Sequence, residues 1–291
     1  MFDIKQYEKA ESVKDAVRLL SENPNAKLIS GGTDVLIRLR EGHSEYSELV
    51  DIHDLEEIKG VSYTDTGDIE ICAATTFTEV VDSEIINDVL PVLALASGTV
   101  GGPQVRNVAT IGGNLCNGAV SADSLASLCV LDALLITESA EGEREIPIID
   151  FYLGPGQVVL GQTEILKSIR ICLDNYAGYG THYYKYAMRN AMDIATIGCA
   201  AAVKMDDGKI ETLKISFTVA APKPIRAKTA EEFAVGLEPT EENIKKIAKQ
   251  VMNDVTPRDS WRASKDFRLH IIETLAERVI KHAAEDAGGE S

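Results

Sequence analysis

The spacing of hydrophobic residues divides the chain into two parts with different patterns. In the first part, short apolar strands alternate with amphipathic helices, beginning with a strand around Phe2 and Ile4 and a helix that follows Ser12. In the second part, from about residue 176, three strands precede two helices. Interleaved elements followed by a block of strands and then helices favour an α+β protein over one doubly wound sheet.

Turn and cap residues set the expected ends of these elements. Ser12 is the expected N-cap of the first helix, and the turn Asp206-Asp207-Gly208-Lys209 predicts a hairpin between two late strands. Residues 174–180 read as a linker, and residues 151–157 favour a plain connecting loop over a loop that covers a planar ligand. Strands are predicted at 27–30, 47–52, 67–73, 133–137, 145–149, 183–188, 195–205 and 210–221, and helices at 13–20, 35–39, 78–81, 91–96, 125–130, 240–252 and 265–284.

Residues 99–124 form the least ordinary stretch, because they are rich in glycine and poor in bulky side chains. Glycine permits sharp turns and close approach of a ligand to the main chain. We therefore expect a loop whose amides and hydroxyls surround a phosphate group; the alternative is a surface loop without a ligand. The glycines are Gly101, Gly102, Gly112, Gly113 and Gly118, and the short polar residues are Thr110, Asn114, Asn117, Ser121 and Asp123.

A second glycine pair lies between a predicted strand and a predicted helix. Gly31-Gly32-Thr33-Asp34 follows the apolar residues 28–29 and precedes the helix at 35–39. Free amides at the start of a helix suit a pyrophosphate; the alternative is a tight turn with Thr33 or Asp34 as the N-cap. Two such loops, about 70 residues apart, suit a dinucleotide whose diphosphate is held from two sides.

The overall composition excludes several kinds of partner. The 291 residues carry a net charge of −17, with 45% hydrophobic residues, so a large core is available but no basic surface for nucleic acid or an anionic membrane. The first residues do not resemble a signal peptide, and no apolar run approaches the length of a membrane span. We expect a cytoplasmic protein that binds neither nucleic acid nor membrane.

No metal site and no catalytic residue is predicted. The five cysteines form no Cys-x-x-Cys pair and the five histidines do not cluster. A Rossmann fingerprint, a Walker A loop and a Gly-x-Ser-x-Gly elbow are all missing from the sequence. Lys185 is either a group that stabilises negative charge on a reduced flavin or a surface cation on an edge strand. Trp261, the only tryptophan, is expected to hold the last helix.

Several motifs together resemble one family. Ser30-Gly31-Gly32-Thr33-Asp34, residues 102–107, Thr110-Ile111-Gly112-Gly113-Asn114 and residues 220–226 resemble the FAD-binding medium subunit of molybdenum hydroxylases, the xanthine dehydrogenase and carbon monoxide dehydrogenase group. The resemblance covers nearly the whole chain. It implies a vanillyl-alcohol-oxidase-type FAD-binding domain at residues 1–175, with subdomains of about 1–55 and 56–175, followed by a smaller C-terminal α+β domain at 176–291.

The resemblance also implies residue roles. The first loop would carry the FAD diphosphate and adenosine, the second loop would hold the ribityl–diphosphate part, and Asp123 would bind the adenosine ribose or nearby groups. Leu166 and Lys185 would lie near the isoalloxazine, while the sequence at 153–155 departs from relatives that place an aromatic ring over the flavin. The full cofactor-binding set is Leu28, Ile29, Ser30, Gly31, Gly32, Thr33, Asp34, Val35, Val100, Gly101, Thr110, Gly112, Gly113, Asn114, Asn117, Asp123, Leu166 and Lys185.

The function implied by the resemblance is electron transfer within a three-subunit enzyme. A molybdopterin-binding large subunit would oxidise a purine such as xanthine, and a small subunit with two-iron two-sulfur clusters would pass the electrons to the FAD, with NAD+ as the acceptor. The alternatives are the FAD subunit of a nicotinate-type dehydrogenase, a self-contained flavin reductase of the same fold, and a non-catalytic nucleotide-binding assembly protein.

Overall fold

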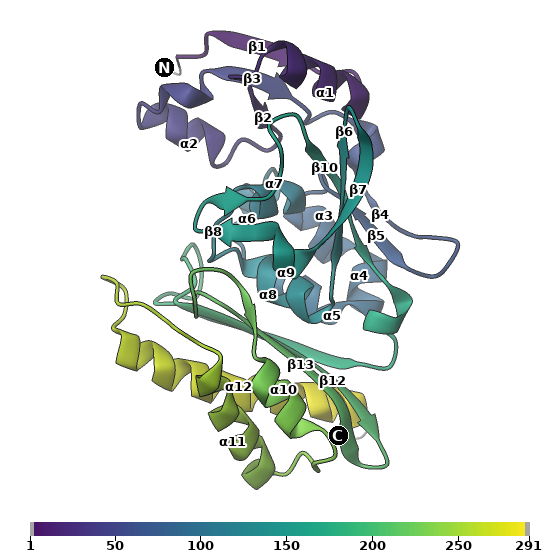
Figure 1. Cartoon of the computed structure of the whole chain (residues 1–291), viewed down its shortest axis with the longest axis vertical. Coiled ribbons are helices and arrows are strands. Elements are labelled where there is room, and N and C mark those ends of the chain that lie inside the picture. The colour runs from purple at the N-terminus through teal and green to yellow at the C-terminus, as the bar shows by residue number, and fades with distance from the viewer. Residues whose placement is uncertain (1–2, 289–291) are drawn as a thin grey trace.

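The computed structural model describes residues 3–288, and these residues form three layers stacked along the long axis of the molecule (Figure 1). The strand expected around Phe2 and Ile4 begins later, at Gln6, and Phe2 lies outside the described residues. Sheets and helices are mixed as predicted, so the α+β class is confirmed. Within residues 3–288, no helix has the length and apolar character needed to cross a bilayer.

The N-terminal layer is a small parallel sheet with a helix packed on it. The sheet has the order β1-β3-β2. Ser12 caps α1 as predicted, because its hydroxyl accepts a hydrogen bond from the Asp15 N–H, and Val13 and Leu20 lie on its buried face. The elements are β1 (Gln6–Lys9), α1 (Val13–Glu22), β2 (Lys27–Ile29), α2 (Val35–Arg40) and β3 (Glu48–Asp51).

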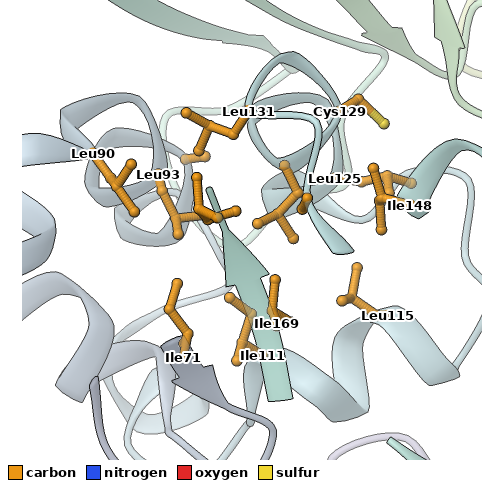
Figure 2. Packing of buried hydrophobic residues seen from close by; sticks show 14 of the residues in the cluster. Ile71, Leu90, Leu93, Ile111, Leu115, Leu125, Cys129, Leu131, Ile148 and Ile169 are labelled. Atoms are coloured by element: carbon orange, nitrogen blue, oxygen red, sulfur yellow. The ribbon is translucent and has the colours of Figure 1, made fainter. Parts of the chain in front are cut away.

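The middle layer is an antiparallel sheet of order β4-β5-β10-β6-β7 covered by short helices. Its central strand, β10, was not predicted from the sequence. Figure 2 shows Ile71 and Ile169 of the sheet facing Leu93 and Leu125 of the helices. The elements are β4 (Val61–Tyr63), β5 (Ile69–Cys72), α3 (Phe77–Asp82), α4 (Glu84–Val89), α5 (Pro91–Gly98), α8 (Asp123–Val130), β6 (Leu134–Ser139), β7 (Gly142–Pro147) and β10 (Ile165–Ile171).

The C-terminal layer is a four-stranded antiparallel sheet followed by three helices. The predicted hairpin is confirmed, since Asp207 and Gly208 have positive φ angles of 45° and 74°, as a two-residue turn of this type requires. Strand β12 is buried on both faces: Ala200 and Ala202 pack on the middle layer, while Ala201 packs on the C-terminal helices. The elements are β11 (Gly180–Tyr186), β12 (Ile197–Asp206), β13 (Lys209–Thr218), β14 (Ile225–Arg226), α10 (Lys228–Ala234), α11 (Glu241–Gln250) and α12 (Lys265–Gly288).

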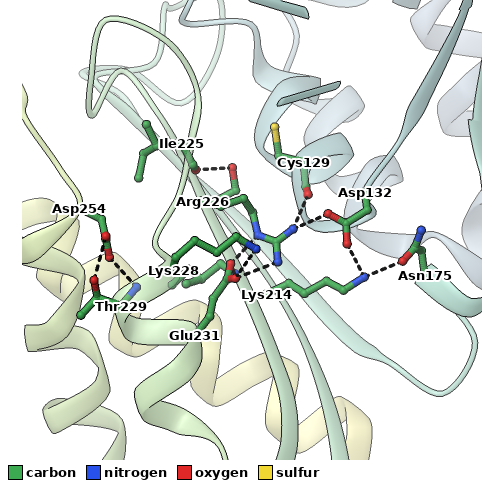
Figure 3. Close-up of polar contacts among 12 residues, drawn as sticks. Cys129, Asp132, Asn175, Lys214, Ile225, Arg226, Lys228, Thr229, Glu231 and Asp254 are labelled. Atoms are coloured by element: carbon green, nitrogen blue, oxygen red, sulfur yellow. Dashed lines mark hydrogen bonds and ion pairs between the residues drawn. The ribbon is translucent and has the colours of Figure 1, made fainter. Parts of the chain in front are cut away.

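A network of charges joins the C-terminal layer to the middle layer, with Arg226, Lys214 and Glu231 buried and Asp132 45% exposed (Figure 3). Arg226 donates to the carbonyl of Cys129 at 3.1 Å and pairs with Asp132 at 2.5 Å. Lys214 pairs with the same carboxylate at 2.7 Å. The guanidinium of Arg226 also holds Glu231, whose side chain is only 8% exposed. The motif that ends at Arg226 therefore connects two layers that are distant in the sequence.

Three predictions about local structure were wrong. The segment 99–124 is not one long loop, because it contains α6 (Pro103–Arg106) and α7 (Ile111–Cys116) and ends in the first turn of α8. The expected plain loop at 151–157 is mostly a hairpin of β8 (Tyr152–Gly154) and β9 (Gln157–Val158). The strand expected through residue 149 ends at Pro147, where α9 (Ile148–Phe151) begins.

Trp261 does not hold the last helix, which corrects a further prediction. Its side chain is 79% exposed, in the loop before α12. The start of α12 is held instead by Arg268, which is 3% exposed and donates to the carbonyl of Thr196 and to the hydroxyl of Ser260. The hydrogen bonds of the buried Arg268 therefore hold the start of α12, and the indole of Trp261 lies on the surface.

Candidate functional site

A cleft of about 510 Å³ lies between the N-terminal and middle layers. Its volume is in the range of cofactor and small-molecule sites, about 300–1,000 Å³. One wall is the turn between β2 and α2, and the other is α7 with the hairpin β8–β9 and the start of β10. The two glycine-rich stretches found in the sequence therefore face the same cavity.

The turn after β2 presents a row of backbone amides without acceptors. Within residues 3–288, the N–H groups of residues 31–35 donate no hydrogen bond to the protein, and these five residues all line the cleft. The buried hydroxyl of Ser30 also has no hydrogen-bond partner among them. Gly32 adopts a positive φ of 71°, which lets the chain turn here. Successive free amides of this kind form an anion-binding concavity.

The amides of the second glycine pair are already bonded within the protein. The bonds run from Ile111 N to Thr75 O, from Gly112 N to Ala73 O, from Gly113 N to Thr110 Oγ1 and from Asn114 N to Thr110 O. This wall of the cleft therefore offers a smooth backbone surface and the side chains of Asn114 and Asn117, rather than free amides. Only the first loop has the free amides expected from the sequence.

The glycines of the two pairs serve different purposes. A Cβ on Gly31 would lie 1.8 Å from the carbonyl oxygen of Val108, and one on Gly112 would lie 2.6 Å from the carbonyl of Ala73. These two glycines are required because backbone packs against backbone. Gly113 differs, because among residues 3–288, apart from its chain neighbours and the backbone of its own helix, its Cβ would approach only Thr110 Oγ1, at 2.9 Å. The absence of a side chain at Gly113 therefore leaves space for a ligand in the cleft, and not for another segment of the backbone.

Fourteen of the residues proposed from the sequence line this cleft, and Ile29, Gly101, Asp123 and Lys185 do not. Several lining residues were not proposed. Sequence signals existed for some of them, because Val105 and Ala109 belong to the glycine-rich stretch 99–124 and Gly156 to the Gly154-Pro155-Gly156 turn. The lining residues missed include Val105, Ala109, Gly156, Val158, Leu160, Gln162 and Glu164.

Glu164 is the carboxylate that fixes the wall formed by residues 158–164. Burial opposes its ionisation, but hydrogen bonds from Arg144, Thr137 and the Gly161 N–H lower its pKa to about 2. Arg144 binds both carboxylate oxygens and also the carbonyl of Val159. A fully paired carboxylate of this kind positions the chain and is not a free acid or base. Burial raises the pKa of the nearby Cys116 thiol to about 12, so it is not a reactive thiolate.

Asp123 and Lys185 form a buried ion pair behind the cleft. The ammonium lies 2.7 Å from the carboxylate and 3.0 Å from the carbonyl of Thr99, next to the cleft residue Val100. The Lys185 side chain is only 8% exposed, so the surface-cation alternative is wrong. The sequence placed Asp123 at the adenosine and Lys185 at the isoalloxazine. Because the two side chains are in contact, one extended FAD cannot satisfy both placements.

The ion pair predicts a pH-dependent stability. Burial of Asp123, only partly offset by Lys185, raises its pKa from 3.8 to about 6. The Asp123 carboxyl therefore binds a proton more tightly in the folded protein than in the unfolded chain. Protonation of Asp123 stabilises the fold at low pH, and this stabilisation is lost as the pH rises through about 6. We expect the unfolding free energy of the wild type, relative to Asp123→Asn, to fall by about 2 kcal/mol between pH 4 and pH 7. Urea unfolding of both proteins at four pH values measures this, and parallel curves would contradict it.

Comparison with known proteins assigns the chain to a family. A model of the FAD binding domain in molybdopterin dehydrogenase matches residues 2–173, and a model of the CO dehydrogenase flavoprotein C-terminal domain matches residues 182–283. This chain is an FAD-binding medium subunit of the molybdenum hydroxylase family. The resemblance predicted from the motifs, the oxidoreductase class and FAD as the cofactor are confirmed.

Similar proteins align with this FAD subunit from end to end. It is 46% identical to a xanthine dehydrogenase FAD-binding subunit of Escherichia coli, over 99% of both chains. It is 30% identical to the glyceraldehyde dehydrogenase medium chain of Sulfolobus acidocaldarius, over 96% of this chain and 98% of the relative. Among solved structures, quinoline 2-oxidoreductase of Pseudomonas putida matches 99% of both chains with a TM-score of 0.93 and 25% identity.

The cleft of this FAD subunit fits the cofactor. The unpartnered amides of residues 31–35 and the Ser30 hydroxyl are donors that suit a diphosphate. The bare face of Gly113 allows close approach from the opposite wall. Within residues 3–288, no three potential metal-binding side chains come together.

Proposed function

We propose that this FAD subunit passes electrons from the iron–sulfur clusters of a small partner subunit to NAD+, within a cytoplasmic complex whose molybdopterin-containing large subunit oxidises a purine such as xanthine. The observation that carries the proposal is the 46% identity to the xanthine dehydrogenase FAD-binding subunit over 99% of both chains. The other relatives cited are less similar, at 32% identity or below. When bound, FAD supplies the exchange between single-electron and hydride transfer.

We assign the residues of the cleft to the parts of the cofactor as follows. The amides of residues 31–35 and the Ser30 hydroxyl hold the diphosphate. Thr110, Asn114 and Asn117, with the bare backbone at Gly113, hold the ribityl end of the diphosphate. Leu166 and Lys185 lie toward the isoalloxazine, and Asp123 keeps the Lys185 ammonium in place rather than contacting the adenosine. The remaining proposed residues, Leu28, Ile29, Val100, Gly101 and Gly112, shape the walls of the cleft or support them.

We also propose domain boundaries near residues 55 and 175. Three groups of buried hydrophobic residues support them. One group consists mostly of residues 10–58, the second mostly of residues 69–183, and the third of residues 197–284. FAD would then bind between the first two units, with the C-terminal unit supplying Lys185.

A second candidate is an enzyme that acts on another N-heterocycle. The chain is 32% identical to the nicotinate dehydrogenase FAD-subunit of Eubacterium barkeri, over 78% of this chain and 77% of that one. The substrate is bound by a different subunit in both candidates, so the cleft described above serves either reaction.

The proposed function has a direct test. We expect the purified chain to carry about one FAD per molecule and to reduce a dye with NADH, and the assembled complex to reduce NAD+ with xanthine. Colourless protein that does not take up FAD would overturn the electron-transfer role. A yellow complex that oxidises nicotinate but not xanthine would favour the second candidate.

A further inference from the structure

A cluster of buried ionisable side chains lies behind the cleft, where α8 meets β11. Asp123 is 8% exposed and Tyr183 is 4% exposed. The Tyr183 hydroxyl donates to one carboxylate oxygen of Asp123 at 3.4 Å, and the Lys185 ammonium lies 2.7 Å from the other oxygen. We call these three residues the Asp123 cluster. A carboxylate, an ammonium and a phenol are therefore in contact with little access to water.

The positive charge of Lys185 borders the cleft. Its ammonium donates to the Asp123 carboxylate and, at 3.0 Å, to the carbonyl of Thr99. An ammonium carries three N–H donors, so within residues 3–288 these two bonds leave one donor for a group outside the chain. Thr99 directly precedes Val100, which lines the cleft. A negative charge on a ligand in this part of the cleft would therefore compete with Asp123 for the ammonium.

The other groups next to Asp123 keep their charge near neutral pH. Within residues 3–288, Lys185 is the one cation paired with the carboxylate. Burial and the charge of Asp123 raise the pKa of the Tyr183 hydroxyl well above its usual value, and burial does the same for the thiol of Cys199 on the neighbouring strand β12. The end of α5 contributes Thr99, which carries no charge. Asp123 is therefore the group whose charge can change.

The remaining charged groups packed near α8 lie at its other end. Asp123 is the first residue of this helix. Lys214 of β13 and Arg226 of β14 pair with Asp132, which follows the last turn of the helix. On the side of α7, the neutral side chain of Asn114 accepts from the Ser124 hydroxyl. The charge of Asp123 is therefore balanced by Lys185.

Asp123 can respond to a charge in the cleft. Burial raises the pKa of its carboxyl to about 6, because Lys185 and Tyr183 offset only part of the cost of desolvation. A negative charge that competes for the ammonium would weaken this offset and raise the pKa of Asp123 further. Near pH 7 the carboxyl is mostly ionised without such a charge, and it would bind a proton when the charge arrives.

Reduction of the flavin by iron–sulfur clusters would bring such a charge. The clusters deliver two electrons without protons, and the reduced ring keeps one negative charge after it binds one proton. Transfer of a hydride to NAD+ removes both electrons and that proton, so the ring becomes neutral again. Each turnover would therefore add and remove one negative charge beside the Asp123 cluster.

We propose that Asp123 is a redox-linked proton site, which takes up a proton from solvent when the bound flavin is reduced and releases it when the hydride leaves. Proton uptake cancels the charge of the carboxylate, so the full positive charge of Lys185 then stabilises the reduced ring. Asp123 acts through Lys185 and is a positioning residue, not a catalytic one. The proposal rests on the proposed function, in which Lys185 is assigned toward the isoalloxazine.

The midpoint potential of the flavin in the FAD-loaded full chain tests the proposal. At about pH 8, we expect the equilibrium constant for flavin reduction to be about tenfold higher in Asp123→Asn than in the wild type, or about 30 mV for two electrons. This is the effect of one negative charge roughly 10 Å away in a protein interior. At about pH 5 the two proteins should have the same potential, because the Asp123 carboxyl is then protonated.

Asp286→Asn is the matched control. Asp286 accepts a hydrogen bond from the Thr181 N–H at the opposite end of β11 from Lys185, so this substitution removes the same charge at the far end of the strand. The potential of the control should follow that of the wild type at every pH.

Tyr183→Phe is a second test, which keeps the carboxylate but removes its hydroxyl donor. That hydrogen bond lowers the pKa of Asp123. The pH at which the flavin potential changes slope should therefore be higher in this variant than in the wild type.

Each other outcome has a defined meaning. Parallel potentials of the wild type and Asp123→Asn from about pH 5 to about pH 8 would overturn the proposal, even if the variant binds FAD more weakly. If Asp123→Asn does not fold, the same slope change in Tyr183→Phe and the wild type would overturn it. Colourless wild-type protein would instead refute the proposed function, whereas yellow wild-type protein with parallel potentials would refute only the proton site.

Discussion

Replacing Gly113 with valine is expected to produce protein that lacks FAD. A side chain at this position projects from α7 into the cleft, and its Cβ would also come within 2.9 Å of the Thr110 hydroxyl that caps the helix. Overpacking of this kind costs about 1–3 kcal/mol, which corresponds to an increase of about 5- to 150-fold in the Kd for FAD. Absorbance of the purified protein and titration with FAD measure the effect.

Gly98→Val is the matched control for this prediction. Gly98 is exposed at the end of α5, and no described atom lies within 4 Å of the place its Cβ would take. The control should therefore fold and bind FAD like the wild type. Equal FAD affinity in the two variants would show that the cofactor does not approach Gly113, and the assignment of α7 to the cleft wall would be wrong.

Arg226→Met is expected to cause the largest loss of stability. The substitution leaves the carboxylate of Glu231 buried without its guanidinium partner and removes the bonds from Arg226 to Asp132 and to the carbonyl of Cys129. Breaking a buried pair in this way costs about 3–5 kcal/mol. The decrease should appear in the free energy of unfolding measured with urea, because the network joins two layers of the protein.

Lys228→Met provides the comparison, because Lys228 pairs with the same carboxylate, at 3.0 Å, but its side chain is 63% exposed. An exposed pair contributes about 0–1 kcal/mol. The buried and exposed partners of Glu231 should therefore differ by at least about 2 kcal/mol. Similar losses in the two variants would mean that Arg226 does not connect the layers as the geometry indicates.

Local patterns were sufficient where neighbouring residues determine the structure. The cap at Ser12, the turn at Asp207 and Gly208, and the hairpin of β12 and β13 that this turn joins depend on residues close together in the sequence. The sequence alone therefore predicted them. The two glycine pairs, together with the motifs at residues 102–107 and 220–226, also predicted the family and the cofactor, because the combination of these motifs is specific.

Long-range contacts explain the elements that were missed. Strand β10 contains the charged residues Lys167 and Arg170, which obscure its apolar pattern. In the folded protein Lys167 pairs with Glu138 on the neighbouring strand β6 and with Glu143 on β7, one strand further away, and Arg170 pairs with Glu145 of β7. The prediction for Trp261 was wrong because a large aromatic side chain is usually buried. In this protein Arg268 is buried at the start of α12, and Trp261 is exposed.

The sequence by itself determined that the protein has two glycine-rich segments, a strong negative charge and the motifs of an FAD subunit. Only the tertiary structure decided which amides are available to a ligand. The N–H groups of residues 111–113 are bonded to Ala73, Thr75 and Thr110, whereas those of residues 31–35 face the cleft without acceptors. The reason is physical: a backbone donor is free or bonded according to which segment packs against it, and packing partners lie far apart in the sequence.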